Sequence, residues 1–117
     1  MTPYADIRFE TIGRVIVARL EGEIDMSNAG EVGAAITGRV TSDAVAVVLD
    51  HRAVEYLDSA GIHVVFELRE RLARRGQEIR LVVPADSPVA TTLHYADVPR
   101  TLGAAETVKA AIADVED

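Results

Sequence analysis

The chain has 117 residues, of which 49% are apolar and 26% charged, and it contains no cysteine. This length fits one domain, and the lack of cysteine excludes disulfides, iron–sulfur clusters, thiolate zinc sites and cysteine nucleophiles. The net charge of −7 argues against binding to nucleic acid or to an anionic membrane surface. No apolar run is long enough to span a bilayer, and residues 1–6 lack the pattern of a signal peptide, so we expect a cytoplasmic protein.

The first third of the chain predicts a hairpin followed by a helix. Apolar and charged residues alternate over 7–11, and a β-branched run occupies 15–20. A short glycine-containing link between them favours antiparallel pairing. Ser27 or Asn28 can then cap a helix, which apolar residues at helical spacing extend to about Val40.

The middle third predicts a buried strand and a long helix. The continuous apolar run 44–49 ends at Asp50 and is typical of a strand that is covered on both faces. Residues 51–57 are expected to form a loop. A strongly amphipathic segment follows over 59–75, and Gly76 is well placed to end that helix.

The last third predicts a strand over 79–83, a short helix over 87–95 begun by a Ser-Pro pair, an edge strand over 98–102 and a final helix over 104–115. Strands and helices alternate in the second half of the chain, which favours parallel pairing with right-handed crossovers. Together with the hairpin, this predicts an α/β fold in which helices cover a mixed sheet.

Asp58 and Ser59 lie at the predicted start of the long helix. The first backbone N–H groups of a helix have no partner within it, and the positive end of the helix dipole lies there. A phosphate on Ser59 would add a charge of about −1.5 to −2 and so change which partners can dock. The alternative interpretation is that one of these two residues is only a helix cap.

Two other arrangements of polar residues are candidates for chemistry. The acidic turn at 22–25 can hold a metal ion, lie near the Ser59 loop, or simply be solvated. His63 follows Ser59 by one helical turn, as a serine hydrolase would use it, but Ser59 lies in Asp-Ser-Ala-Gly and not in G-x-S-x-G. Phosphate-binding loops and recognised metal-ligand spacings are missing from the sequence. We therefore expect no catalytic residue, no cofactor and no metal.

Three stretches of the sequence resemble a known family. They are Leu-Glu-Gly-Glu-Ile-Asp at 20–25, Val-Val-Leu-Asp at 47–50 and Tyr-Leu-Asp-Ser-Ala-Gly-Ile at 56–62. With their spacing, these stretches resemble the STAS-domain anti-sigma factor antagonists of bacteria over nearly the whole chain. The resemblance implies that residues 1–117 form one STAS domain of this type. It also implies a mixed, mostly parallel sheet with about four helices packed mainly on one side.

The resemblance also implies a function in transcription regulation and stress response. The unphosphorylated antagonist binds an anti-sigma factor that is itself an ATP-binding serine kinase, which releases the sigma factor. Phosphorylation of the motif serine, here Ser59, separates the pair, and a phosphatase restores binding. Asp25, Asp58, Ser59, Ala60 and Gly61 would form the partner-binding site, and the chain would be a substrate, not an enzyme. The alternative is a STAS scaffold or small-ligand-binding module without a phospho-switch.

Overall fold

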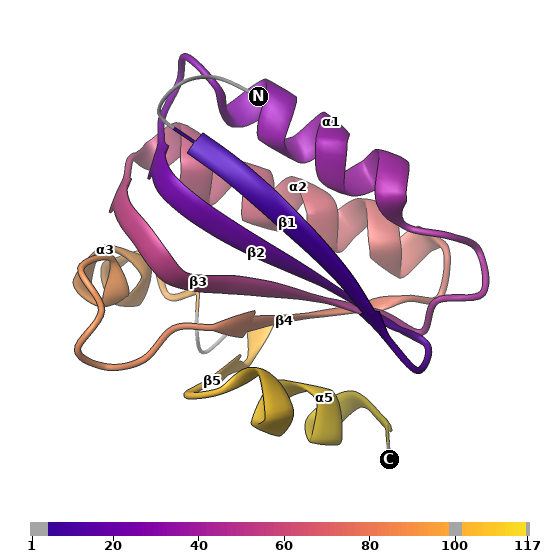
Figure 1. Cartoon of the computed structure of the whole chain (residues 1–117). Coiled ribbons are helices and arrows are strands. Elements are labelled where there is room, and N and C mark those ends of the chain that lie inside the picture. Colours follow the sequence, from indigo (N-terminus) through magenta and orange to yellow (C-terminus); the bar gives the residue numbers. More distant parts are fainter. Residues whose placement is uncertain (1–4, 99–101, 117) are drawn as a thin grey trace.

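A five-stranded sheet organises the computed structural model, which describes residues 5–98 and 102–116 (Figure 1). The strands lie side by side in chain order: β1 (Ala5–Ile12), β2 (Val15–Ile24), β3 (Ala46–Leu57), β4 (Glu78–Val82) and β5 (Ala104–Ala105). β1 and β2 are antiparallel, and the remaining neighbours are parallel. The connecting helices are α1 (Ala29–Arg39), α2 (Ser59–Arg74), α3 (Ala90–Tyr95) and α5 (Val108–Glu116).

The predicted hairpin is confirmed. Ile12 pairs with Val15 across a two-residue link, and Gly13 has a φ of 60°. Tight hairpin turns of this length need positive φ at their first central residue, which glycine adopts without strain. The glycine therefore sets the register of the pair, and in that register Phe9 lies opposite Ala18.

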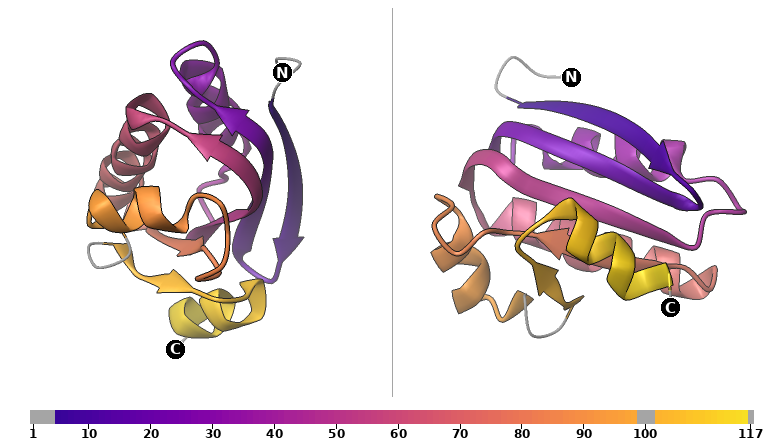
Figure 2. Two further views of the ribbon diagram at one scale, coloured as in Figure 1. Left: turned by 90° about the vertical axis from the view of Figure 1, so that its left-hand side faces the viewer. Right: turned by 60° about the horizontal axis from the view of Figure 1, so that its bottom comes forward.

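The sheet separates two apolar cores. The larger one lies under α1, α2 and α3, where the predicted inward residues of α2, including Val65, Leu68 and Leu72, are buried. The smaller one joins Val15, Val17, Val48 and Val82 to Ala111 of α5, which lies on the opposite face (Figure 2). The helices thus pack mainly on one side, and the predicted class, α/β with a mixed and mostly parallel sheet, is confirmed.

The expected loop over 51–57 is wrong, because β3 continues to Leu57. Its pairing with β2 shifts register twice, between Arg19 and Glu21 and between Gly22 and Glu23, and each time β3 contains one residue more than β2. Such bulges break the alternation of buried and exposed residues that identifies a strand. They also bend the end of β3 toward the start of α2.

The other differences lie in the last third of the chain. The predicted short helix begins only at Ala90, because the preceding residues form turns. Of the predicted edge strand over 98–102, Val98 and Leu102 are helical, and 99–101 fall outside the described residues. The edge of the sheet is instead filled by β5, because the C=O groups of Gly103 and Ala105 accept hydrogen bonds from β4 and the residue after it. The final helix accordingly starts at Val108.

Candidate functional site

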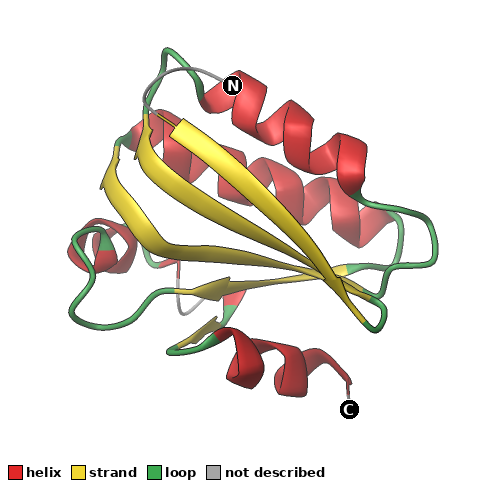
Figure 3. Ribbon diagram, in the orientation of Figure 1, coloured by secondary structure: helices red, strands yellow, loops and turns green. Residues whose placement is uncertain are grey.

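The candidate site is built where β2 and β3 end (Figure 3). Ile24 and Leu57 pair in the last register position of the two parallel strands. Just beyond that pair, the Asp58 N–H donates to the Ile24 C=O over 3.3 Å. The turn after β2 and the first turn of α2 are therefore neighbours, so the Gly22–Asp25 segment lies near the Ser59 loop as one interpretation of the sequence anticipated.

Asp58 makes hydrogen bonds in two directions. One carboxylate oxygen accepts the N–H groups of Ala60 and Gly61, over 2.9 and 3.1 Å, so Asp58 is the N-cap of α2. The other oxygen accepts the Met26 N–H over 3.2 Å. Asp58 thus caps its own helix and ties the turn after β2 to it, while Ser59, the first helical residue, is exposed.

Asp25 organises the turn after β2. Its carboxylate accepts the backbone N–H of Ser27 over 2.9 Å and the hydroxyl of the same residue. These hydrogen bonds, the side-chain one first, lower the pKa of Asp25 below its usual range. The buried Asn28 accepts the Asp25 N–H over 3.0 Å and donates to the Glu23 C=O over 2.8 Å. The turn is therefore held by side chains, and the Asp25 carboxylate is ionised at neutral pH.

Gly61 allows the first turn of α2 to lie against the strand ends. A Cβ atom at this position would be 3.1 Å from Cγ of Leu57 and 3.2 Å from Cγ2 of Ile24. Real Cβ atoms rarely approach so closely, so a larger residue would push the helix start away from the sheet. The glycine of the motif thereby fixes where Ser59 lies.

Two apolar side chains near Ser59 were missed by the sequence analysis. Met26 is 84% exposed and follows Asp25, and Tyr56 is 52% exposed and precedes Asp58 by two residues. Exposed large apolar side chains are informative when they gather near one site. A methionine between polar residues of a turn was a visible signal, whereas Tyr56 fell within the segment that was expected to be a loop.

The remaining alternatives concern histidines and metals. The His63 side chain is 73% exposed and lies 3.3 Å from Glu67, one turn further along α2. No hydrogen bond joins His63 to Ser59 in the structure, so the pair that the hydrolase alternative would need is not assembled. Among residues 5–98 and 102–116 we find no group of three His, Asp or Glu side chains arranged to hold a metal ion.

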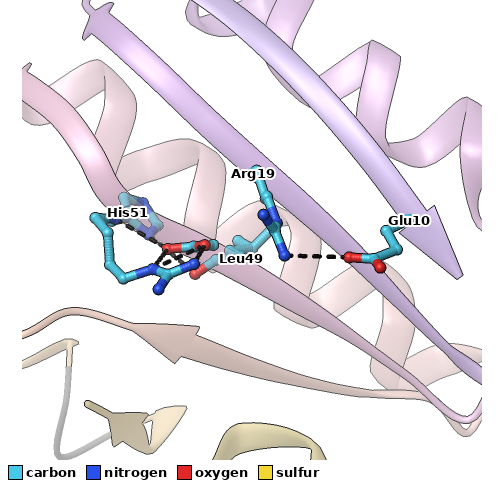
Figure 4. Close-up of polar contacts among 6 residues, drawn as sticks. Glu10, Arg19, Leu49 and His51 are labelled. Carbon is cyan, nitrogen blue, oxygen red and sulfur yellow. Dashed lines mark hydrogen bonds and ion pairs between the residues drawn. The ribbon is translucent and has the colours of Figure 1, made fainter. Parts of the chain in front are cut away.

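His51 lies at the first bulge of β3 and is fully buried (Figure 4). Its Nδ1 is 3.2 Å from the Leu49 C=O, and its Nε2 is buried without a hydrogen-bond partner. Burial lowers the pKa of His51 to about 4, against the smaller raising effects of the Leu49 hydrogen bond and of Asp50. Asp50 itself is buried and paired with the Arg52 guanidinium over 2.7 Å. The bulge that leads to Ser59 therefore contains a neutral histidine.

Comparison with solved structures places this geometry among known folds. An anti-sigma factor antagonist from Mycobacterium paratuberculosis is 27% identical, with a TM-score of 0.82 over 99% of this chain and 98% of that one. The antagonist SpoIIAA in its unphosphorylated form is 19% identical, with a TM-score of 0.76 over 95% of this chain and 96% of that one. At that identity, the likeness to SpoIIAA shows the fold alone.

Comparison of amino-acid sequences also finds a protein that is similar to this chain. The probable sulfate transporter 3.4 of Arabidopsis thaliana is 36% identical over 72 residues, which are 59% of this chain and 11% of the transporter. Within the described residues, no helix is long and apolar enough to cross a membrane. The STAS domain model matches residues 6–111, nearly the whole chain. The chain therefore belongs to the STAS domain family.

Proposed function

We propose that this chain is an anti-sigma factor antagonist whose binding is switched by phosphorylation of Ser59. The observation that carries the proposal is the exposure of Ser59 at the first position of α2, where a kinase can reach its hydroxyl. The structural similarity to an anti-sigma factor antagonist over 99% of the chain supports the same function. The chain is then a single STAS domain over residues 1–117 that acts by binding, in the cytoplasm.

The hydrogen bonds around Ser59 explain why phosphorylation would be felt by a partner. The N–H groups of Ala60 and Gly61, which a phosphate at a helix start would otherwise use, are already bonded to Asp58. A phosphate of about −1.5 to −2 charge would therefore remain exposed beside the Asp58 carboxylate. Like charges and the cost of desolvating the phosphate would oppose docking of the partner.

The surface next to Ser59 has the composition of a docking site. The exposed Met26 and half-exposed Tyr56 supply apolar area, and the exposed acidic side chains of Glu23 and Glu55 lie in the same strand ends. This combination fits a partner with apolar pockets and basic side chains. We infer that the partner is the ATP-binding serine kinase that acts as anti-sigma factor, and that a phosphatase reverses its action.

Binding measurements with charge-changing variants test the proposal. Ser59→Ala and Ser59→Glu would serve as baits to capture a kinase from host lysate. The captured kinase is then purified with its ATP-binding site intact. We expect the purified kinase to bind Ser59→Ala and to bind Ser59→Glu at least about tenfold more weakly, which corresponds to about 1.4 kcal/mol. The same kinase with ATP should phosphorylate the wild-type chain at Ser59 and leave Ser59→Ala unmodified.

Ser42→Glu provides the matched control, because Ser42 is exposed in the turn before β3, at the opposite end of that strand from Ser59. It makes the same change in charge and should leave the affinity for the kinase unchanged. Equal binding of the Ser59→Ala and Ser59→Glu baits would contradict the phospho-switch.

A second function is favoured by one observation. A groove of about 550 Å³ lies between α3 and β5, lined among others by Val83, Thr91, His94, Tyr95 and Glu106. Such a groove suits a STAS module that binds a small ligand and has no phospho-switch. Ligand binding that Ser59→Ala leaves unchanged and that Thr91→Trp abolishes would favour this function.

A further inference from the structure

The outer side of β1 is an open edge of the sheet (Figure 1). β1 pairs with β2 without a register shift from Ala5 to Ile12, and this segment contains no proline. Prolines and bulges are devices that commonly protect an exposed edge from other strands. Within the described residues, no strand covers this side. β1 is therefore a regular template to which another strand can pair.

The register of the hairpin shows which backbone groups face this open edge. Hydrogen-bonded and non-hydrogen-bonded pairs alternate in antiparallel strands, and the pair next to a two-residue turn is hydrogen-bonded. Counting back from Ile12, the residues whose N–H and C=O groups point outward are Ala5, Ile7, Phe9 and Thr11. Consistent with this, the Ile7 N–H donates to the Asp6 carboxylate over 2.9 Å.

The charges on the uncovered face of β1 are arranged symmetrically about Phe9. Arg8 and Glu10 flank it, and the Arg8 side chain is 72% exposed while the Glu10 side chain is half-exposed. Each has a partner on β2: Arg8 lies 3.4 Å from Glu21, and Glu10 lies 3.2 Å from Arg19 (Figure 4). The residue directly opposite Arg8 is nevertheless Arg19, a like charge that the diagonal pairs must offset.

We propose that two copies of this chain associate through their β1 edges, antiparallel, with the two-fold axis at Phe9. This register places Glu10 of each copy directly opposite Arg8 of the other, so each arginine gains an acidic residue directly opposite it, where β2 presents Arg19. It also pairs the two Phe9 rings, each of which has the Arg39 guanidinium 4.5 Å from its centroid. The Asp6–Ile7 hydrogen bond is exchanged for a bond between strands.

Other registers fit less well. An axis at Arg8 would oppose the two Arg8 side chains. An axis at Ile7 pairs Asp6 of each copy with Arg8 of the other. In that register, however, only Ala5–Phe9 of the described residues pair between the two copies. The axis at Phe9 uses Asp6–Ile12 of both copies and closes a self-complementary interface, as a two-fold dimer requires. The proposal makes no use of Ser59, so its outcome is independent of the proposed phospho-switch.

The test measures molar mass by sedimentation or light scattering over a range of concentrations. The wild-type chain should reach the mass of two copies as concentration rises. Arg8→Glu and Glu10→Arg should each remain single chains, because in either homodimer like charges face one another twice. An equimolar mixture of the two variants should regain the double mass, because every acidic side chain of one then meets a basic side chain of the other.

The control is Arg69→Glu, which makes the same change in charge on the exposed face of α2 and should dimerise like the wild type. Circular dichroism of each variant confirms that it is folded. A wild-type chain that keeps the mass of one copy at millimolar concentration would overturn the proposal. So would a mixture of Arg8→Glu and Glu10→Arg that stays monomeric.

Discussion

The carboxylate of Asp58 holds the backbone N–H of Met26 over 3.2 Å, although the two residues belong to different loops. Its second oxygen caps α2. The motif aspartate is thus shared between the helix that begins at the candidate phospho-acceptor and the turn that carries Asp25. The Asp58 side chain therefore holds the two loops together, beside the backbone hydrogen bond that Asp58 donates to Ile24.

Replacing Asp58 separates its two roles. Asp58→Ala removes both the cap and the link to Met26, and we expect it to lower the free energy of unfolding by about 1 to 2 kcal/mol. Asp58→Asn keeps one carbonyl oxygen for the cap but has only an amide NH₂ group to face the Met26 N–H. It should therefore retain most of the stability and still speed hydrogen exchange at Met26. Urea unfolding and amide exchange measure the two effects, and equal exchange at Met26 in Asp58→Asn and wild type would contradict this division.

Gly61→Ala should destabilise the fold by about 1 to 3 kcal/mol, because its methyl group would press on Leu57 and Ile24. Gly30→Ala in α1 is the matched control, since a Cβ atom there meets nothing within 4 Å. That change should instead stabilise the helix by about 0.5 to 1 kcal/mol. Urea unfolding measures the free energy of unfolding of both variants. An increase in both would show that packing at Gly61 does not limit stability.

Met26→Ala should weaken binding of the kinase partner by about tenfold or more if Met26 fills an apolar pocket of that partner. Its stability should change by less than about 0.5 kcal/mol, because the side chain is exposed. Tyr95→Ala is the control, since Tyr95 is equally exposed at 84% but belongs to α3. Titration calorimetry with the purified kinase compares the two variants. A loss of affinity in Tyr95→Ala alone would move the docking surface to α3.

His51 makes stability depend on pH. Its pKa is about 4 in the folded chain against 6.5 for the free side chain, so the unfolded state binds a proton in the interval between these values and the folded state does not. The stabilisation is therefore complete above about pH 6.5 and falls as the pH drops toward 4, by on the order of 3 kcal/mol. Asp25 and Asp43, whose pKa values are lowered by hydrogen bonds, lose their contribution only below the ordinary aspartate pKa of 3.8.

The measurement is urea unfolding of the wild type and of His51→Gln at pH 7.5 and pH 5. We expect the wild type to lose more stability between these two pH values than His51→Gln does. Equal losses would mean that His51 is charged in the folded chain or that the fold opens around it.

Local patterns predicted those elements whose geometry is regular. The apolar run after Ala44 is continuous, as in a strand covered on both faces, and the stripe of Val65, Leu68 and Leu72 repeats with the period of a helix. For these reasons β3 and α2 were predicted, as was the end of α2 at Gly76, which has a φ of 71°. The continuation of β3 over 51–57 was not predicted, because each bulge shifts the alternation of buried and exposed residues by one position. A bulge depends on the neighbouring strand, which a local pattern does not contain.

The candidate site was likewise predicted only in part from the sequence. The motif residues Asp25, Asp58 and Ser59 were placed together from their sequence positions and the resemblance, and the structure brings their loops side by side. Met26 and Tyr56 were missed, because whether an apolar side chain is buried is decided by the packing of the whole chain. The bond between Asp58 and Met26 is likewise tertiary: it joins residues that are 32 positions apart.

The order of the strands in space equals their order along the chain. During synthesis on the ribosome, each new strand can therefore add to an edge that has already been made, and no earlier strand has to open to admit a later one. The segment that contains the turn after β2, the whole of β3 and α2 is continuous in sequence, from Gly22 to Arg74. We therefore expect the surface around Ser59 to take shape on the nascent chain before β4 and β5 complete the sheet.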